Sequence, residues 1–224
     1  MVEQYIPNHY IQKYILSILT HQQYARFRDM RPPKVDTNLY SYHLKLLQKR
    51  CMIQKTDGGY TLDKAGMLYI DRVSAALLNI RTQPKIITMI MVQNTDGDVL
   101  LQKRTKQPYI NSWTLPYGKL HIDDASVQAA ARREAYEKLG AHDLAMRHMG
   151  DCYIRVQQGG ELLTTTLAHV FYAETNDIVL TDGLIWVRPH KLGEYQLAPA
   201  VEQVVARTLF RDPFFFEEFT ENLL

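Results

Sequence analysis

Residues 115–141 read LPYGKLHIDDASVQAAARREAYEKLGA, a loop followed by a helix and a second loop. The helix is expected to run from Ser126 to Leu139, because Gly140 is the residue type that most often ends a helix. Glu134 and Glu137 are three residues apart, so both side chains project from one face of that helix. Carboxylate oxygens are the ligands that Mg²⁺ and Mn²⁺ prefer. The stretch therefore predicts a candidate cation site on the helix.

Two further residues of this stretch have the chemistry to support such a site. Arg133 precedes Glu137 by four residues, close enough to orient that carboxylate through a charge-assisted hydrogen bond. Gly118 permits a tight turn that brings a backbone carbonyl toward the cation. These residue types fit a site for a divalent cation.

The same residues carry a resemblance to a known family. The segments 115–119 (LPYGK) and 133–141 (REAYEKLGA), with Asp124 between them, resemble the Nudix box. That box is the loop–helix–loop signature of hydrolases that cleave nucleoside diphosphates linked to another moiety. The segment 99–104 before the box and Trp186-Val187 after it are similar to the family's flanking elements. The resemblance covers about residues 84–210 and implies an α/β/α sandwich around a mixed sheet.

The resemblance implies a hydrolase that depends on Mg²⁺ or Mn²⁺. Glu134 would activate water or bind the metal, Glu137 would bind the metal, and Arg133 would orient the carboxylates. The metal site would be completed by Asp124 and by the backbone at Gly118. A nucleoside-diphosphate substrate would be held by three cations and one aromatic ring. The cations expected at the phosphates are Lys103, Arg104 and Lys119, and the ring expected at the base is Tyr109.

Three departures from the signature keep a second function open. Asp124 stands where the signature has glutamate, and the interval to the Arg-Glu pair is one residue longer. Tyr117 replaces the first residue of a familiar double glycine. Lys138 replaces the second glutamate of a Glu-Glu pair, and it follows Glu134 by four residues, the spacing of a helical ion pair. An ammonium group cannot bind a cation. The alternative to hydrolysis is a transcription regulator whose degenerate domain senses a nucleotide metabolite without turnover.

Charge is distributed unevenly along the chain. Residues 1–82 contain 12 Lys and Arg against 6 Asp and Glu, a net +6, whereas residues 83–224 contain 14 against 18, a net −4, and the two add to the overall +2. A chain of 224 residues exceeds the usual ~100–200 of one domain. We therefore expect two domains, 1–82 and 83–224, joined at Asn79–Lys85. The basic first domain predicts a polyanionic partner.

The pattern of the first domain is mainly helical. Helices are expected over 8–20, 37–50 and 64–78, with a short segment over 24–30 and a hairpin over 52–62. This order resembles a winged helix-turn-helix, which implies binding to double-stranded DNA. With Leu39, Leu44 and Leu47 inside, the helix residues expected to face DNA are Tyr40, Ser41, His43, Lys45, Lys49 and Arg50, joined by Lys55 of the hairpin. Docking or dimerisation through this domain is the alternative.

The second domain alternates strands and helices. Strands are expected over 85–93, 99–104, 151–157, 162–172 and 184–187, and a last helix near 199–210. The C-terminal tail is too apolar to remain in water, because it contains Phe214, Phe215, Phe216 and Phe219. It should dock on its own domain or on a second subunit of a homodimer.

Composition excludes several classes of protein. Apolar residues make up 46% and charged residues 22%, so disorder, collagen-like repeats and coiled coils fit poorly. The longest aliphatic run, 86–92, is far shorter than the ~20 residues that cross a bilayer, and the first ten residues lack the pattern of a signal peptide. Two distant cysteines, Cys51 and Cys152, favour a reducing compartment. A cytoplasmic protein without membrane contact is expected.

Overall fold

The computed structural model describes residues 5–73, 83–210 and 214–223, which divide into two units, Met1–Thr82 and Gln83–Leu224. The helix expected over 64–78 ends at Arg72, because Val73 is already extended; residues 74–78 and most of the joint at 79–85 lie outside the described residues. Among the described residues, no helix is both long enough and apolar enough to span a membrane.

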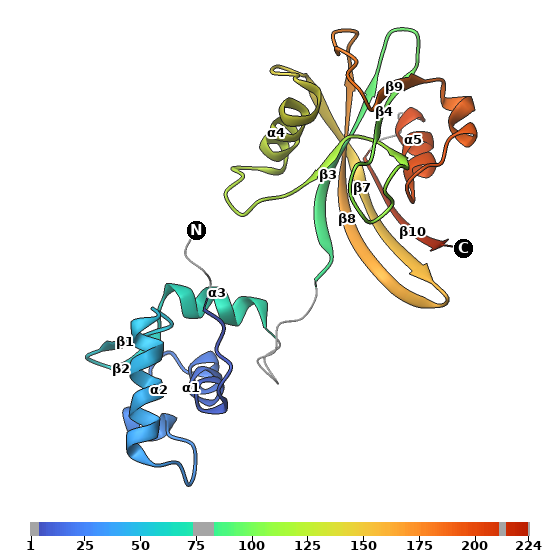
Figure 1. Cartoon of the computed structure of the whole chain (residues 1–224). Helices are drawn as coiled ribbons and strands as arrows, with labels where there is room; N and C mark the ends of the chain where they lie inside the picture. The colour runs from blue at the N-terminus through green and yellow to red at the C-terminus, as the bar shows by residue number, and fades with distance from the viewer. Residues whose placement is uncertain (1–4, 74–82, 211–213, 224) are drawn as a thin grey trace. The chain divides into compact units, whose positions relative to one another are not determined.

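The first unit contains helices and one hairpin (Figure 1). Its elements are α1 (Tyr10–His21), the 3-10 turn η1 (Phe27–Met30), α2 (Thr37–Lys49), β1 (Ile53–Thr56), β2 (Gly59–Leu62) and α3 (Lys64–Arg72). The Asp36 carboxylate accepts hydrogen bonds from the first-turn amides of α2, and the Asp63 carboxylate accepts one from the first amide of α3. These caps satisfy amides that have no partner inside a helix, which fixes where both helices begin.

The buried face of α2 differs from the predicted one. Leu44 and Leu47 are buried as expected, but Leu39 is 44% exposed and Tyr40 is fully buried. The Tyr40 hydroxyl donates to the carbonyl of Phe27 at 2.8 Å. The apolar stripe follows the helical spacing i, i+4, i+7 from residue 40, and Leu39 lies one position off that stripe.

His43 is also buried, contrary to the expectation that it faces a polyanion. Its Nδ1 lies 3.3 Å from the Gln12 amide nitrogen, and its ring stacks on that of His9 with centroids 3.9 Å apart. Burial, followed by the nearby His9, lowers the pKa of His43. Tyr40 and His43 therefore hold α2 against the rest of the unit, and the expectation that they are accessible is wrong.

The second unit is built on one mixed sheet with helices on both faces (Figure 1). The strands β10, β7, β8, β3, β4 and β5 follow one another across it, with β6 also paired to β3 and β9 to β4. The pairs β3–β8 and β10–β7 are parallel, and the others are antiparallel. The elements are β3 (Lys85–Gln93), β4 (Val99–Lys103), β5 (Trp113–Thr114), β6 (Tyr117–Lys119), α4 (Val127–Leu139), β7 (Met146–Gln158), β8 (Glu161–Glu174), β9 (Leu184–Val187), the 3-10 turn η2 (Pro189–Glu194), α5 (Val201–Leu209) and β10 (Phe215–Leu223).

Alternation along β3 separates the two cores of this unit. Met89 and Met91 belong to the core that includes α5, whereas Ile90 and Val92 belong to the core under α4. Figure 1 shows α4 on one face of the sheet and α5 on the other, the sandwich that the resemblance implies.

The aromatic tail forms an additional strand. β10 pairs with β7 from Phe215 opposite Gly150 to Leu223 opposite Gln158. Phe215 and Phe219 pack on the core of this unit, as expected for docking on its own domain. Phe214 and Phe216 are each 58% exposed.

Candidate functional site

The helix α4 places one acid in the core. Its first turn is capped by the Ser126 hydroxyl, which accepts a hydrogen bond from the Ala129 amide, and Gly140 ends it with φ +66. The buried side is made of small and apolar residues together with Glu134, which is 5% exposed. A buried carboxylate needs partners, since an unpaired charge away from water is very costly.

Arg133 binds the acids of the signature to one another. Its Nε and Nη2 donate to the two oxygens of Asp124 at 3.0 and 2.9 Å, and its Nη1 donates to Oε1 of Glu134 at 2.6 Å. Its Nη2 also donates to the carbonyl of Lys119 at 3.1 Å. The hydrogen bonds from Arg133, followed by one from the His121 amide, lower the pKa of Asp124 to about 2.

Lys138 neutralises the second oxygen of Glu134. Its Nζ lies 3.3 Å from Oε2 of Glu134 and 5.0 Å from the centre of the Tyr117 ring. Both oxygens of Glu134 are thus paired with side-chain cations. Glu137 is 53% exposed, and its Oε1 lies 3.8 Å from Nη1 of Arg133.

The residues present do not fit a divalent cation at this helix. Both oxygens of Asp124 accept hydrogen bonds from Arg133 or the His121 amide, and the two oxygens of Glu134 face Arg133 and Lys138. A Cβ on Gly118 would lie 1.6 Å from the carboxylate carbon of Glu134, which shows how closely this side chain is packed. The expected metal ligands Glu134, Glu137, Asp124 and Gly118 lie together, but around cations of the chain itself.

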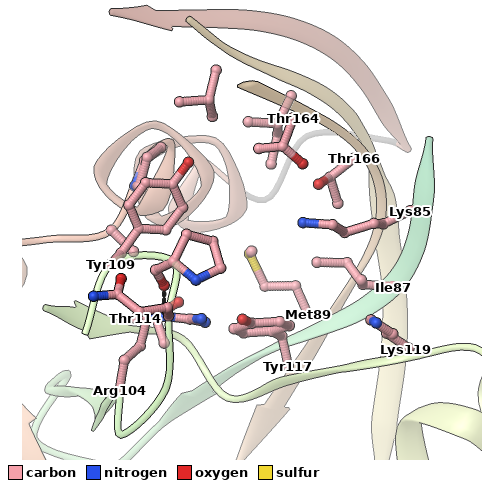
Figure 2. A pocket seen from close by; sticks show the side chains of 16 residues that line it. Lys85, Ile87, Met89, Arg104, Tyr109, Thr114, Tyr117, Lys119, Thr164 and Thr166 are labelled. Carbon is pink, nitrogen blue, oxygen red and sulfur yellow. Dashed lines mark hydrogen bonds between the residues drawn. The ribbon is translucent and has the colours of Figure 1, made fainter. Parts of the chain in front are cut away.

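A cavity of about 210 Å³ lies between the sheet and the loop that follows β4. Its walls combine cations, two aromatic rings, three threonines and an apolar floor (Figure 2). The residues with these roles are Lys85, Arg104 and Lys119, Tyr109 and Tyr117, Thr114, Thr164 and Thr166, and Ile87 and Met89. Figure 2 shows the Lys85 side chain reaching into the cavity from the strand side, opposite Tyr109.

The electrostatics of the cavity favour an anion. None of the lining residues is acidic, and within the described parts of the chain no carboxylate forms an ion pair with Lys85, Arg104 or Lys119. Burial, then Lys119 and then Arg104, lower the pKa of Lys85. A lowered lysine pKa means that positive charge is disfavoured there, so a bound anion relieves the repulsion.

Arg104 is held in place by the loop and by the aromatic rings. Its Nε donates to the carbonyl of Pro108 at 2.8 Å and its Nη2 to the carbonyl of Lys106 at 3.2 Å. Its guanidinium carbon lies 5.2 Å from the centre of the Tyr117 ring and 5.9 Å from that of Tyr109. Because backbone carbonyls already fix this guanidinium, little side-chain entropy is lost when it binds an anion.

The cavity contains three of the four predicted substrate-binding residues and two further residues with suitable side chains, Lys85 and Tyr117. Arg104, Tyr109 and Lys119 are brought together, but Lys103 lines a separate depression, with its Nζ 5.9 Å from the centre of the Trp113 ring. Arg104 also borders that depression, but of the two residues only Arg104 lines the cavity. The sequence predicts Lys85 only as the start of a buried strand, which gives no sign of a role in binding.

The acids and the cavity lie on opposite sides of β6. Tyr117 and Lys119 line the cavity, whereas Gly118 between them packs on Glu134. Lys138 lies next to both groups, since it approaches Glu134 and the Tyr117 ring. Lys138, which stands where the signature has a glutamate, thus lies between the acids and the cavity.

Comparisons with known proteins agree with this architecture. The sequence model of the NUDIX domain matches residues 83–208, more than half of the chain, and the chain therefore belongs to the NUDIX family. No curated protein sequence matches it significantly.

Solved structures with the same fold are distant in sequence. A MutT protein from Bacillus halodurans is 19% identical, with a TM-score of 0.51 over 61% of this chain and 89% of that one. The NUDIX domain of Shewanella oneidensis NrtR, solved with ADP ribose, is 15% identical, with a TM-score of 0.50 over 65% of this chain and 97% of that one. At these identities the likeness concerns the fold alone.

Proposed function

We propose that the Nudix domain binds a nucleoside-diphosphate derivative in the basic cavity and senses it without hydrolysing it. The observation that carries this proposal is the ion pair between Lys138 and Glu134. It puts an ammonium group at the acid that would otherwise bind metal or activate water. Metal-assisted attack on a phosphate needs a cation held by carboxylates, and here the chain's own cations occupy those carboxylates.

The cavity supports a ligand with two phosphates and an aromatic base. Lys85, Arg104 and Lys119 supply three positive charges for the phosphates, and arginine suits phosphate because its planar donors form paired hydrogen bonds. Tyr109 and Tyr117 offer rings on which a base can stack. The ADP ribose bound by the NrtR domain is a compound of this class.

The decisive experiment measures binding and turnover on the same sample. The full chain is titrated calorimetrically with ADP ribose, other dinucleotides and sugar nucleotides, with and without Mg²⁺ or Mn²⁺, and each mixture is then analysed for cleavage products. We expect saturable binding of at least one compound that does not require metal, and no products. Metal-dependent release of nucleoside monophosphate would support hydrolysis and overturn the sensor.

We further propose that the first unit is a winged helix that binds double-stranded DNA. Exposed basic residues support this: Lys45 and Lys49 on α2, Arg50 directly after it and Lys55 on β1, with Ser41 half-buried on α2. Tyr42, which the sequence reasoning passed over, is 62% exposed on the same helix. A helix of this size fits the major groove, and a hairpin can follow the phosphates.

Salt dependence tests the DNA proposal. Duplex binding is measured at two salt concentrations for the full chain, for the K45A/K49A variant and for Lys191→Ala, an exposed charge in the other unit. Loss of two phosphate contacts should reduce the logarithmic salt slope by about 2. Identical slopes in all three proteins would favour docking or dimerisation. Repetition with the nucleotide present shows whether the ligand shifts DNA affinity, as a regulator requires.

A further inference from the structure

A cluster of two histidines and one aspartate lies on β7 and β8, apart from the residues of the signature. Nδ1 of His169 is 2.7 Å and Nε2 of His148 is 2.9 Å from the same oxygen of Asp151, Oδ1. The three ligand atoms lie within 4.8 Å of one another. We propose that these three residues bind one first-row transition-metal ion, with Zn²⁺ as the cation that fits best.

An irregularity in β7 brings the cluster together. His148 and Asp151 are three residues apart, so in a regular strand their side chains would point to opposite faces. The pairing of β7 with β8 shifts register between His148 and Gly150, and this bulge returns both side chains to one face. Asp151 is directly opposite His169 on the neighbouring strand.

The neighbouring strand β10 packs closely against the residue after the bulge, Gly150. A Cβ at Gly150 would lie 2.3 Å from the carbonyl oxygen of Phe215, so only glycine allows β10 to approach here. The His148 ring stacks on Phe171 with centroids 4.8 Å apart, and Phe214 meets it edge-on at 5.0 Å. These contacts orient the imidazole before any ion binds.

The ligand set selects the class of metal. Two imidazole nitrogens and one carboxylate oxygen suit Zn²⁺ and its neighbours, whereas Mg²⁺ and Ca²⁺ prefer oxygen ligands alone. Tetrahedral ligands about 2.0–2.1 Å from zinc are roughly 3.3 Å apart, so the hydrogen-bonded atoms need to separate by only a few tenths of an ångström. Three protein ligands leave a position open for water or a further ligand.

Partial exposure allows an ion to reach the cluster. The side chains of His148, Asp151 and His169 are 35%, 21% and 17% exposed, respectively. The proposal does not depend on the function proposed for the cavity.

Zinc titration of the full chain, without an affinity tag and stripped by a chelator, tests the proposal. Calorimetry should show one Zn²⁺ per chain, unaffected by excess Mg²⁺, and Co²⁺ should give the visible absorption of a low-coordinate site. Loss of one direct ligand in His169→Ala should weaken binding by more than about 100-fold, since even outer partners matter by about 10- to 100-fold.

Two further variants make the result decisive. Asp151→Asn keeps the size of the side chain and its hydrogen-bonding capacity but loses the charge. It should also lose zinc, and it is the variant to use if His169→Ala does not fold. His190→Ala, an exposed histidine outside the cluster, should bind zinc like the parent chain. Equal zinc affinity in the parent chain and in a folded Asp151→Asn or His169→Ala variant would show that the cluster is a hydrogen-bonded network only, and would overturn the proposal.

Discussion

The acids of the Nudix signature and the cations of the cavity are separated by one strand, β6, and differ in how their charge is balanced. Asp124 and Glu134 are paired with Arg133 and Lys138, so the acidic cluster is complete without an ion. The cavity gathers positive side chains and no acid. The comparison teaches that one short strand can separate an acidic cluster whose charges are paired from a cavity whose positive charges have no acidic partner among its lining residues.

The largest effect is expected from removing the guanidinium of the cavity. Arg104→Ala should weaken binding of ADP ribose by about 100-fold, because a hydrogen bond between charged groups contributes about 1.5–3 kcal/mol. Calorimetric titration measures the change. The matched control is Lys103→Ala, which removes the same charge one residue away but outside the cavity. Equal losses in both variants would mean that overall charge, and not the cavity, binds the ligand.

Packing on the acidic side is the next test of the comparison. Gly118→Ala places a Cβ where the carboxylate of Glu134 now lies, and overpacking of this kind costs about 1–3 kcal/mol. The free energy of unfolding, measured by denaturant titration, should fall by this amount. Gly193→Ala is the control, since a Cβ there meets nothing within 4 Å. An unchanged stability for Gly118→Ala would show that Glu134 is not held against β6.

The pH dependence of binding tests whether Lys85 contacts the ligand. The pKa of Lys85 is lowered chiefly by burial, and a protonated lysine is the form that binds an anion. Affinity for ADP ribose should therefore fall, by up to about tenfold, as pH rises through a value below that of an ordinary lysine. Lys85→Arg stays charged and should flatten this part of the profile. A profile that is the same in both proteins would remove Lys85 from the ligand site.

Features formed by residues close together in the sequence could be predicted, whereas features formed by distant residues could not. α4 was predicted because its cap, its acids and the terminating Gly140 lie within fifteen residues. The cavity was only partly predicted because Lys85 meets Thr166 through the parallel pairing of β3 and β8, which no local pattern records. The face of α2 was assigned wrongly since an aromatic ring, Tyr40, begins the buried stripe.

The smallest change in stability, and the most direct challenge to the comparison, comes from Lys138→Glu. It replaces an attractive i, i+4 pair with a repulsive one and should lower the free energy of unfolding by about 0.5–1 kcal/mol, because Arg133 still pairs with the buried carboxylate of Glu134. The same substitution restores the acid of the signature and releases one oxygen of Glu134, so affinity for Mn²⁺ should rise. Lys138→Gln removes the charge without adding a ligand and separates the two effects. If Lys138→Glu binds Mn²⁺ no better than Lys138→Gln, the helix is not a latent cation site, and the balance of charges on that side of β6 has a purely structural role.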